Sequence, residues 1–223
     1  NDGSQFSRGL IGSFENIEII GSSFQSIRSS SDILENINNL TLTNAYISDC
    51  RLNHVGMGVD HVTLNNCIIK GISANSVFYG GYSYIINGGT YGAEGAAIAQ
   101  SGGAGYGGTL ITVTSGSASI VVNSGNFGYN TNGSMFLLYG NGSHITINGG
   151  EFHHNVNRYY RKDRTGVEPL AKNCVYGTVV GTSVRVYNDS GFFKHSVTVT
   201  GGYFHDNVNY DDGGVIACGG DLT

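Results

Sequence analysis

The sequence predicts an all-β fold, a right-handed parallel β-helix (a β-solenoid) with about 22 residues per coil. The first observation is an eight-residue phrase that occurs seven times: apolar–x–apolar–x–small–small–x–apolar. The second is its period, because the first four copies begin 23, 22 and 22 residues apart. The third is strand-like alternation without any helical period. Strand repeats of this length are typical of solenoids whose coils pair in register, and the crossover rule for parallel strands gives the right hand.

The seven copies are expected to form the main strands. Their ranges are 17–24, 40–47, 62–69, 84–91, 120–127, 145–152 and 197–204. The later copies are spaced by 36, 25 and 52 residues, which predicts inserted loops and, in the longest gap, one additional coil. Short strands are also expected after the turns, at 75–79, 134–139, 174–180 and 213–217. Three strands per coil would give a roughly triangular cross-section.

The alternation within the phrase predicts which side chains fill the interior. Val62, Leu64, Ile145, Ile147, Val197 and Val199 should point inward, and Thr63, Thr146 and Thr198 outward. Ile17, Leu40, Val62, Ile120, Ile145 and Val197 should stack along the axis. Phe24, Phe127, Phe152 and Phe204 should form an aromatic column beside them.

Residues 1–223 are interpreted as a single β-helix domain that is part of a longer solenoid or fibre. Two insertions interrupt its repeat, one Gly/Ala-rich at 92–108 and one basic at 158–172. The basic insertion must project from the solenoid, because so many charges cannot face an apolar interior. Its candidate partner-binding residues are Arg158, Tyr159, Tyr160, Arg161, Lys162 and Arg164, which could contact an anionic glycan or an acidic neighbour. A solvated excursion with no partner is the alternative.

Composition excludes several classes of protein. Charged residues make up only 12% of the chain and the net charge is −5, which argues against a nucleic-acid surface. No run of eighteen apolar residues is long enough to span a membrane. The first residues lack the pattern of a signal peptide and an initiator Met. We therefore expect a processed chain, or a piece of a longer one, from an extracellular or cell-surface protein.

Two kinds of covalent modification fit that location. Glycosylation sequons occur at Asn39, Asn132, Asn141 and Asn188. The four cysteines are Cys50, Cys67, Cys174 and Cys218, and an even number permits disulfides. Cys50–Cys67 with Cys174–Cys218 is the preferred pairing. Buried free thiols are the alternative, since Cys50 and Cys67 do not fall at the same position of the repeat.

A short motif recurs in the late copies. The closing Phe is followed three residues later by Asn in Phe127–Asn130, Phe152–Asn155 and Phe204–Asn207, and Gly213-Gly214-Val215-Ile216 follows the last copy. FxxN together with GGx[IL] resembles the tandem repeats of the polymorphic membrane proteins. That resemblance covers roughly residue 123 to the end and implies a surface β-helix used for adhesion. It fades toward the N-terminus, where Phe24 is followed by Ile27.

The recurrent Asn and His residues are candidates for a ladder and for a metal site. Asn130, Asn155 and Asn207 lie at the same phase of the repeat, so they should stack as an amide ladder. His153 and His205 also share a phase, but their 52-residue separation suggests an intervening coil. Neither a metal ion nor any other cofactor is therefore predicted.

Catalysis is not predicted either. Carboxylate chemistry needs two or three acids that converge on one face. The acids here scatter along the repeat, and the one adjacent pair, Asp211-Asp212, lies in a turn. We expect a structural or adhesive protein, a surface stalk or filament subunit. A β-helix enzyme that processes polysaccharides, a lyase or glycoside hydrolase, is the alternative.

The expected partners follow from the ends of the solenoid and from its surface. Neither end shows a cap, so copies of the chain or further coils should stack end to end. Host or cell-surface glycans are the other candidate partners, and no nucleic acid is expected.

Overall fold

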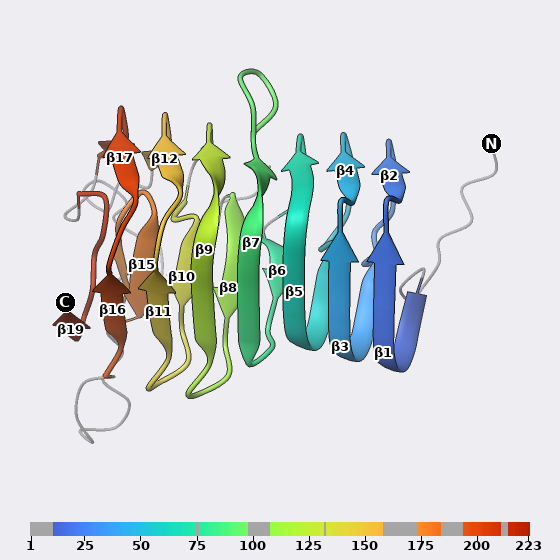
Figure 1. Ribbon diagram of the computed structural model, residues 1–223, viewed down its shortest axis with the longest axis horizontal. Coiled ribbons are helices and arrows are strands. Elements are labelled where there is room, and N and C mark those ends of the chain that lie inside the picture. The colour runs from blue at the N-terminus through green and yellow to red at the C-terminus, as the bar shows by residue number, and fades with distance from the viewer. Residues whose placement is uncertain are drawn as a thin grey trace, which may run out of the picture.

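The protein was analysed as a computed structural model, which describes residues 11–74, 76–97, 108–131, 133–157, 174–183, 194–210 and 214–223. Within these residues the fold is all-β. Seventeen strands form one large sheet and two more form a small one. The strands lie side by side along the long axis of the molecule (Figure 1).

The strands form three sets that recur along the chain. The main set comprises β1 (Ile11–Ile20), β3 (Leu34–Thr43), β5 (Gly56–Lys70), β7 (Ser83–Tyr91), β9 (Ser119–Gly128), β11 (His144–Ile147), β16 (Ser196–Val199) and β19 (Asp221–Leu222). The second comprises β2 (Ser23–Gln25), β4 (Tyr46–Ser48), β12 (Glu151–His153) and β17 (Tyr203–His205). The third comprises β6 (Ser76–Tyr79), β8 (Thr109–Val113), β10 (Phe136–Leu138), β14 (Cys174–Tyr176) and β15 (Val180–Ser183). The small sheet pairs β13 (Val156–Asn157) with β18 (Val208–Asn209).

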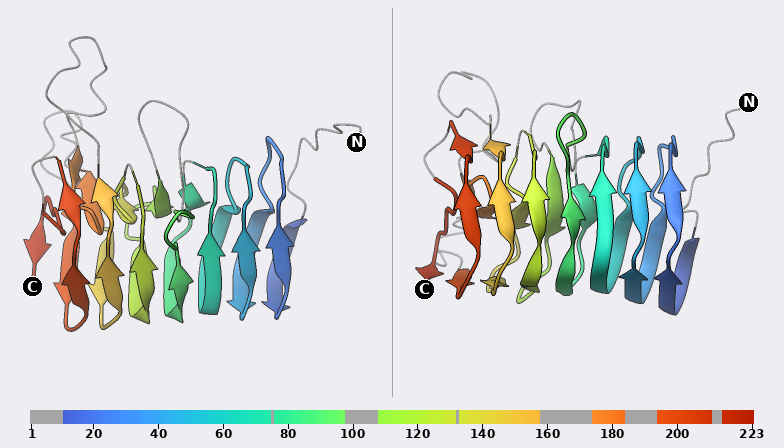
Figure 2. Two further views of the ribbon diagram at one scale, coloured as in Figure 1. Left: turned by 90° about the horizontal axis from the view of Figure 1, so that it is seen from above. Right: turned by 45° about the horizontal axis from the view of Figure 1, so that its top comes forward.

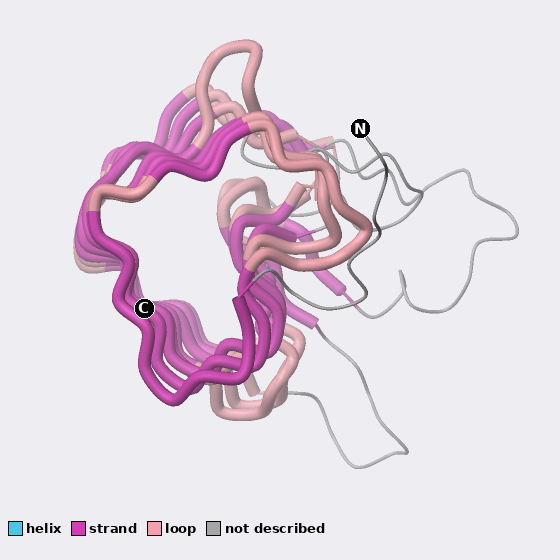
Figure 3. The backbone as a smooth tube through the Cα atoms, turned by 90° about the vertical axis from the view of Figure 1, so that its right-hand side faces the viewer, coloured by secondary structure: helices cyan, strands magenta, loops and turns pink. Residues whose placement is uncertain are grey.

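Pairing is parallel throughout the described strands, apart from the antiparallel pair β14–β15. Each main strand pairs with the equivalent strand of the next repeat: Ile17 lies opposite Leu40, Leu40 opposite Val62 and Val62 opposite Tyr84. The three sets face different directions, so the sheet is strongly curled (Figures 2 and 3). The fold is therefore a large, curled parallel sheet built from in-register repeats.

The structure corrects the expectation of an additional coil between the last two phrases. β11 pairs directly with β16, and β12 pairs directly with β17, although the partners are 52 residues apart. The segment expected as one strand at 174–180 instead forms β14 and the start of β15, and β15 pairs with β10. One long repeat, extended by excursions, therefore spans the gap. Residues 98–107 and 158–173, which hold most of both predicted insertions, lie outside the described residues.

The predicted interior is confirmed. Val62, Leu64, Ile145, Ile147 and Val197 are buried, and Val199 is half-buried against the core. Thr63, Thr146 and Thr198 are half-buried, and so are more exposed than the buried residues that precede them, Val62, Ile145 and Val197. The column that begins at Ile17 continues in register to Leu222.

The aromatic column differs from the expected one at its N-terminal end. The rings of Tyr91, Phe127, Phe152 and Phe204 stack nearly parallel, with centroids 4.7–4.8 Å apart. This separation equals the spacing of neighbouring strands, so each repeat adds one ring. Phe24 lies in the same column, but Ile47 and Ile69 separate it from Tyr91.

Cys50 and Cys67 are buried, free thiols, and the disulfide between them is not formed in this structure. Cys67 pairs in register with Gly89, whereas Cys50 lies five positions further along its own repeat, beside Ile72. Each thiol donates to backbone carbonyls, Cys50 to Ser48 and Cys67 to Leu42. Cys218 is also a free thiol, and the side chain of Cys174 is not described. The Cys50 and Cys67 environments match the alternative of buried thiols.

Candidate functional site

The FxxN motif divides each late repeat into two inward and two outward residues. Phe152 and Asn155 are buried, and the two residues between them lie on the outer surface. The second of the two has a left-handed backbone: φ is 59° at Tyr129, 52° at His154 and 52° at Asp206. The motif therefore fixes a turn from inside and presents a pair of variable side chains outside.

The predicted Asn ladder is present beneath that turn. The Asn155 side chain donates to the Phe127 carbonyl (3.1 Å) and to Asn207 Oδ1 (2.9 Å), and its Oδ1 accepts from the Asn130 amide (3.0 Å). Asn207 repeats the pattern by donating to the Phe152 carbonyl at 2.8 Å. Asn155 and Asn207 thus satisfy backbone groups of the preceding repeat, which a buried turn requires, whereas Asn130 donates to the Gly133 carbonyl of its own repeat at 3.0 Å.

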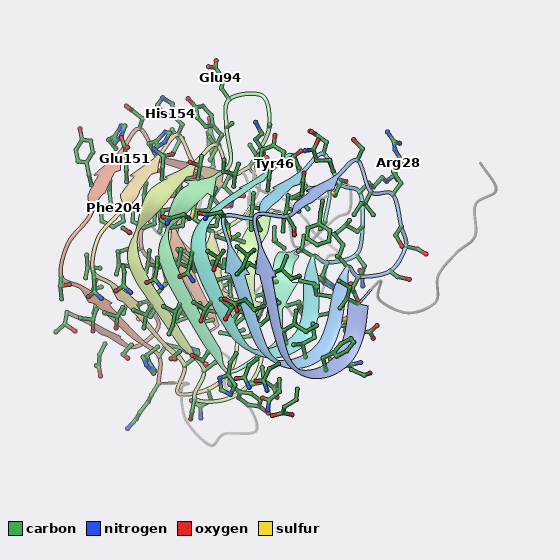
Figure 4. All side chains as sticks on the ribbon, turned by 45° about the vertical axis from the view of Figure 1, so that its right-hand side comes forward. Arg28, Tyr46, Glu94, Glu151, His154 and Phe204 are labelled. Atoms are coloured by element: carbon green, nitrogen blue, oxygen red, sulfur yellow. The ribbon has the colours of Figure 1, made fainter. Side chains whose placement is uncertain are left out.

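The outward residues of the last two repeats gather into one site, the histidine–carboxylate cluster, which consists of Glu151, His153, His154, His205 and Asp206. Register pairing places His153 beside His205, and their rings stack at 5.4 Å. The expectation that a coil separates them is wrong, because β12 pairs directly with β17. The ends of β2, β4, β5, β9, β12 and β17 lie in register, and together with the turns that follow them they form one ridge along the molecule. In Figure 4, Tyr46 and Arg28 lie toward the N-terminal end of this ridge and Glu151 and His154 toward its C-terminal end.

A continuous chain of hydrogen bonds links the cluster. His205 contacts Asp206 through Nδ1 (2.7 Å) and Glu151 through Nε2 (3.0 Å), so both nitrogens donate when the ring is protonated. Asn126 donates to the other oxygen of Glu151 at 3.0 Å, and its own oxygen accepts from His153 Nε2 at 2.9 Å. His154 then donates through Nδ1 to the free Nδ1 of His153 at 2.9 Å. One assignment of protons, with His205 charged and His153 neutral, satisfies every bond.

Electrostatics agree with that assignment. Hydrogen bonds to Asp206 and then to Glu151 raise the pKa of His205. The same bonds from His205 lower the pKa of both carboxyl groups. Burial lowers the pKa of His153 and favours its neutral form; the Glu151 carboxylate opposes this effect, and the charges of His154 and His205 add to it. When His205 is protonated, the cluster therefore holds its imidazolium between two carboxylates from adjacent repeats.

Two tyrosines flank the cluster. Tyr203, which is 63% exposed, stacks on His205 with centroids 4.5 Å apart. Tyr129 stacks on His154 at 5.1 Å. Together with the histidine rings they make an aromatic and polar outer surface over the last three repeats.

This geometry limits the chemistry of the cluster. A glycosidase places two carboxyl groups on either side of a sugar. Here the His205 ring fills the space between Glu151 and Asp206, so a sugar cannot enter between them. Among the residues the structure describes, no group of three or more His, Cys, Asp or Glu side chains is arranged to hold a metal ion. Surface recognition by hydrogen bonding and stacking is what this arrangement can do.

Two further polar features were not foreseen from the sequence. A second amide ladder, half-buried at its first two members and exposed at its last two, has side-chain hydrogen bonds of 2.8–2.9 Å between repeats and consists of Asn65, Asn87, Asn123 and Asn148. Asp32 and His54, which precede β3 and β5, form a buried pair with a 3.0 Å contact, and the Tyr79 ring lies 5.1 Å from His54. Their 22-residue separation was the available signal, because it places both at one position of the repeat.

The other candidate residues are placed only in part. Asn39 and Asn141 are exposed, Asn39 on β3 and Asn141 in a turn where its oxygen accepts from the Lys194 amide. Neither touches the histidine–carboxylate cluster. Several candidates lie outside the described residues: Asn132, Asn188, the Asp211-Asp212 pair and the candidate partner-binding residues Arg158, Tyr159, Tyr160, Arg161, Lys162 and Arg164.

No protein-family model, curated protein or solved structure matches this chain. The part of the chain that the structure describes contains no helix with the length and hydrophobicity needed to cross a bilayer.

Proposed function

We propose that this chain is a right-handed parallel β-helix that acts outside the cell as a non-catalytic structural or adhesive element, a surface stalk or filament subunit. The observation that carries the proposal is the continuity of side-chain columns through the repeats. The column from Ile17 to Leu222 and the rings from Tyr91 to Phe204 keep strict register across unequal loops. Because each repeat buries the apolar face of its neighbour, such an array is a stiff rod.

The handedness follows from the crossover rule. Parallel strands of one sheet are joined by right-handed connections in about 98% of cases. In this proposal the three strand sets are the three sides of each coil, and the curled sheet closes into a solenoid.

The adhesive part of the proposal rests on the ridge of FxxN turns. Phe and Asn hold the turn from inside, so the two residues between them can vary without loss of the frame. The resemblance of these motifs to polymorphic membrane protein repeats agrees with a surface role. Asn141 is exposed in a turn, so among the described sequons it is the best placed to carry the N-linked glycan expected of a secreted protein.

Association with further coils belongs to the same proposal. Among the described strands, β1 pairs only with β3 and β17 only with β12. An unpaired strand edge is a template for another strand, from the same chain or from a second copy. Ile20 on β1 is 62% exposed, which adds apolar surface at that edge.

Electron microscopy of the purified 223-residue chain tests the proposal. Single particles should be straight rods of uniform width, or fibres built from such rods. Light scattering should show mass that increases with concentration if copies associate end to end. Round particles, or rods whose width varies with the preparation, would contradict the solenoid.

A further inference from the structure

The N-terminal part of the ridge carries a second charged group, the arginine–lysine cluster, which consists of Arg28, Arg51 and Lys70. Within the described ranges, Lys194 is the only other lysine or arginine. The three cations therefore concentrate on one edge of three consecutive repeats. This edge is the same ridge that carries the histidine–carboxylate cluster further along, as the labels of Arg28 and Glu151 show in Figure 4.

The repeat aligns the two arginines. Arg28 and Arg51 pair in a parallel bridge, and Arg51 pairs in turn with Ser73, so both arginines project from one column in adjacent repeats. Both are exposed. Lys70 lies three residues before Ser73, and its Nζ is 5.6 Å from the centre of the Tyr46 ring. The two arginines thus lie along the direction in which the repeats stack, and Lys70 lies in the column of Ser48, three residues earlier in the repeat.

No carboxylate in the described structure neutralises the arginines. The ion pairs that the described residues form all involve histidine and leave Arg28 and Arg51 unpaired. The nearest acid in sequence, Asp49, accepts a hydrogen bond from the Ser48 hydroxyl at 3.0 Å and lies against Gly71. Asp32 is engaged with His54. Like charges on neighbouring strands destabilise a sheet, so this column lowers stability without a compensating contact.

We propose that the arginine–lysine cluster binds an anionic polysaccharide whose sulfate or carboxylate groups follow the stacking direction of the repeats. Each guanidinium binds one anionic group through its planar fork of N–H donors. Lys70 adds a point charge, and the half-exposed Tyr46 ring offers an apolar face to a sugar. The inference deepens the adhesive part of the proposed function, on which it rests, by naming the ligand class and the residues.

The charge pattern favours a polysaccharide over a nucleic acid. The chain has a net charge of −5, and Glu151 and Asp206 lie further along the same ridge. A duplex needs many phosphate contacts for tight binding, and the acidic part of the ridge would repel it. A short stretch of anionic sugars needs only the three repeats that carry the cluster.

Binding to immobilised polysaccharides tests the inference. The probes are heparin (sulfated), hyaluronate (carboxylated only) and dextran (neutral), measured at about 0.15 M salt. The wild-type chain should bind heparin, hyaluronate or both, and not dextran. Preference between the first two identifies the anionic group, and either result supports the site. Arg28→Gln and Arg51→Gln should each weaken binding about tenfold, the effect of one lost charged hydrogen bond.

Matched variants separate a built site from general charge. Lys194→Gln removes the same charge from an exposed position elsewhere and should leave affinity unchanged. Arg51→Lys should retain part of the affinity, because it keeps the charge but loses the fork. Unchanged melting temperatures in all variants establish that the fold is intact.

Several outcomes would overturn the inference: no wild-type binding to either anionic polysaccharide, equal losses for Arg51→Gln and Lys194→Gln, or tight binding by the double variant Arg28→Gln/Arg51→Gln. Equal or tighter binding to duplex DNA or to vesicles with anionic lipid would also overturn it. The rods seen by electron microscopy do not depend on these results, so failure of the ligand site is distinguishable from failure of the scaffold.

Discussion

The early and late repeats form the same backbone turn but pack different side chains beneath it. At the position three residues after the closing residue, early repeats carry Ile27, Cys50 and Ile72, and late repeats carry Asn130, Asn155 and Asn207. The residue before that position is left-handed in both halves, for example Asp49 and His154. The backbone therefore sets the turn, and the position beneath it accepts either apolar packing or an amide ladder.

Cys50 shows how close the two solutions are. Its Sγ lies 3.7 Å from the Phe24 carbonyl, the same contact that Asn155 makes to Phe127 and Asn207 makes to Phe152. A thiol is a weak donor, so the early version depends more on packing. Burial raises the pKa of Cys50, which keeps the thiol protonated and unreactive.

At the last residue of the eight-residue phrase, a change in side-chain volume is compensated by the residue two positions before it. Late repeats place Gly two residues before the ring, and a Cβ at Gly150 would lie 3.2 Å from the Phe127 ring and 3.3 Å from the Phe152 ring. Early repeats place Ala45 or Cys67 before the smaller Ile47 or Ile69. Large ring with Gly and small aliphatic with Ala or Cys fill the same space, as close packing of an interior requires.

The largest expected effect breaks the frame shared by both halves. Ile147→Asp places a carboxylate where the side chain is fully buried, and an unpaired charge there costs several kcal/mol. We expect no cooperative thermal transition by circular dichroism. Thr146→Asp, one residue away on the outer face, should fold and melt within a few degrees of wild type. Equal stability of the two variants would contradict the register.

The next effect compares the aromatic column with its isolated early member. Phe152→Ala removes a buried ring that stacks on both sides and should lower the free energy of unfolding by about 3–5 kcal/mol. Phe24→Ala should cost less, because Phe24 is half-buried and its neighbour in the column is Ile47. Urea denaturation measures both. A larger loss at Phe24 would show that the column does not stabilise the late repeats.

A smaller effect distinguishes the two Asn ladders. Asn155→Ala leaves the backbone N–H of Asn130 buried without a partner, at about 1–3 kcal/mol. Asn148→Ala removes an exposed link, and water can replace its partners, so the change should be about 1 kcal/mol or less. Similar losses of unfolding free energy for the two variants in urea denaturation would mean that burial does not decide how much an amide ladder contributes to stability.

The smallest effect is the pH dependence of the His205 contacts. The raised pKa of His205 gives stability that is complete below the ordinary histidine value, about 6.5, and is lost as pH rises through the folded-state value. The lowered pKa values of Glu151 and Asp206 give stability that is lost as pH falls through their folded-state values. The melting-temperature difference between wild type and His205→Gln should therefore peak near about pH 5–6 and shrink as pH rises through the folded-state pKa of His205.

The sequence predicted the strand phrase, its inward and outward faces and the Asn130–Asn155–Asn207 ladder, because each depends on local alternation and phase. It did not predict that β12 lies directly beside β17. Loop length is a poor guide to the number of repeats, since long excursions cost little extra closure entropy. That single error in spacing concealed the histidine–carboxylate cluster, whose two carboxylates meet only when those repeats are adjacent.

The cysteines illustrate a different limit. An even number of cysteines permits disulfides, yet pairing requires the two Cα atoms to come close. Cys50 and Cys67 occupy different columns, and each thiol packs against the residues of its own column rather than against the other cysteine. The position of each cysteine in the repeat was therefore a better guide to disulfide pairing than the number of cysteines.

Cross-strand nuclear Overhauser effects between backbone protons test whether each inner strand pairs in register with one neighbouring repeat along each of its two edges. Ile145 should show contacts to Ile120 on one side and to Val197 on the other. These partners are 25 and 52 residues away, so no local structure can produce both signals. The account predicts both contacts in one folded species. Contacts from Ile145 to only one of the two partners, or to strands of another register, would contradict it.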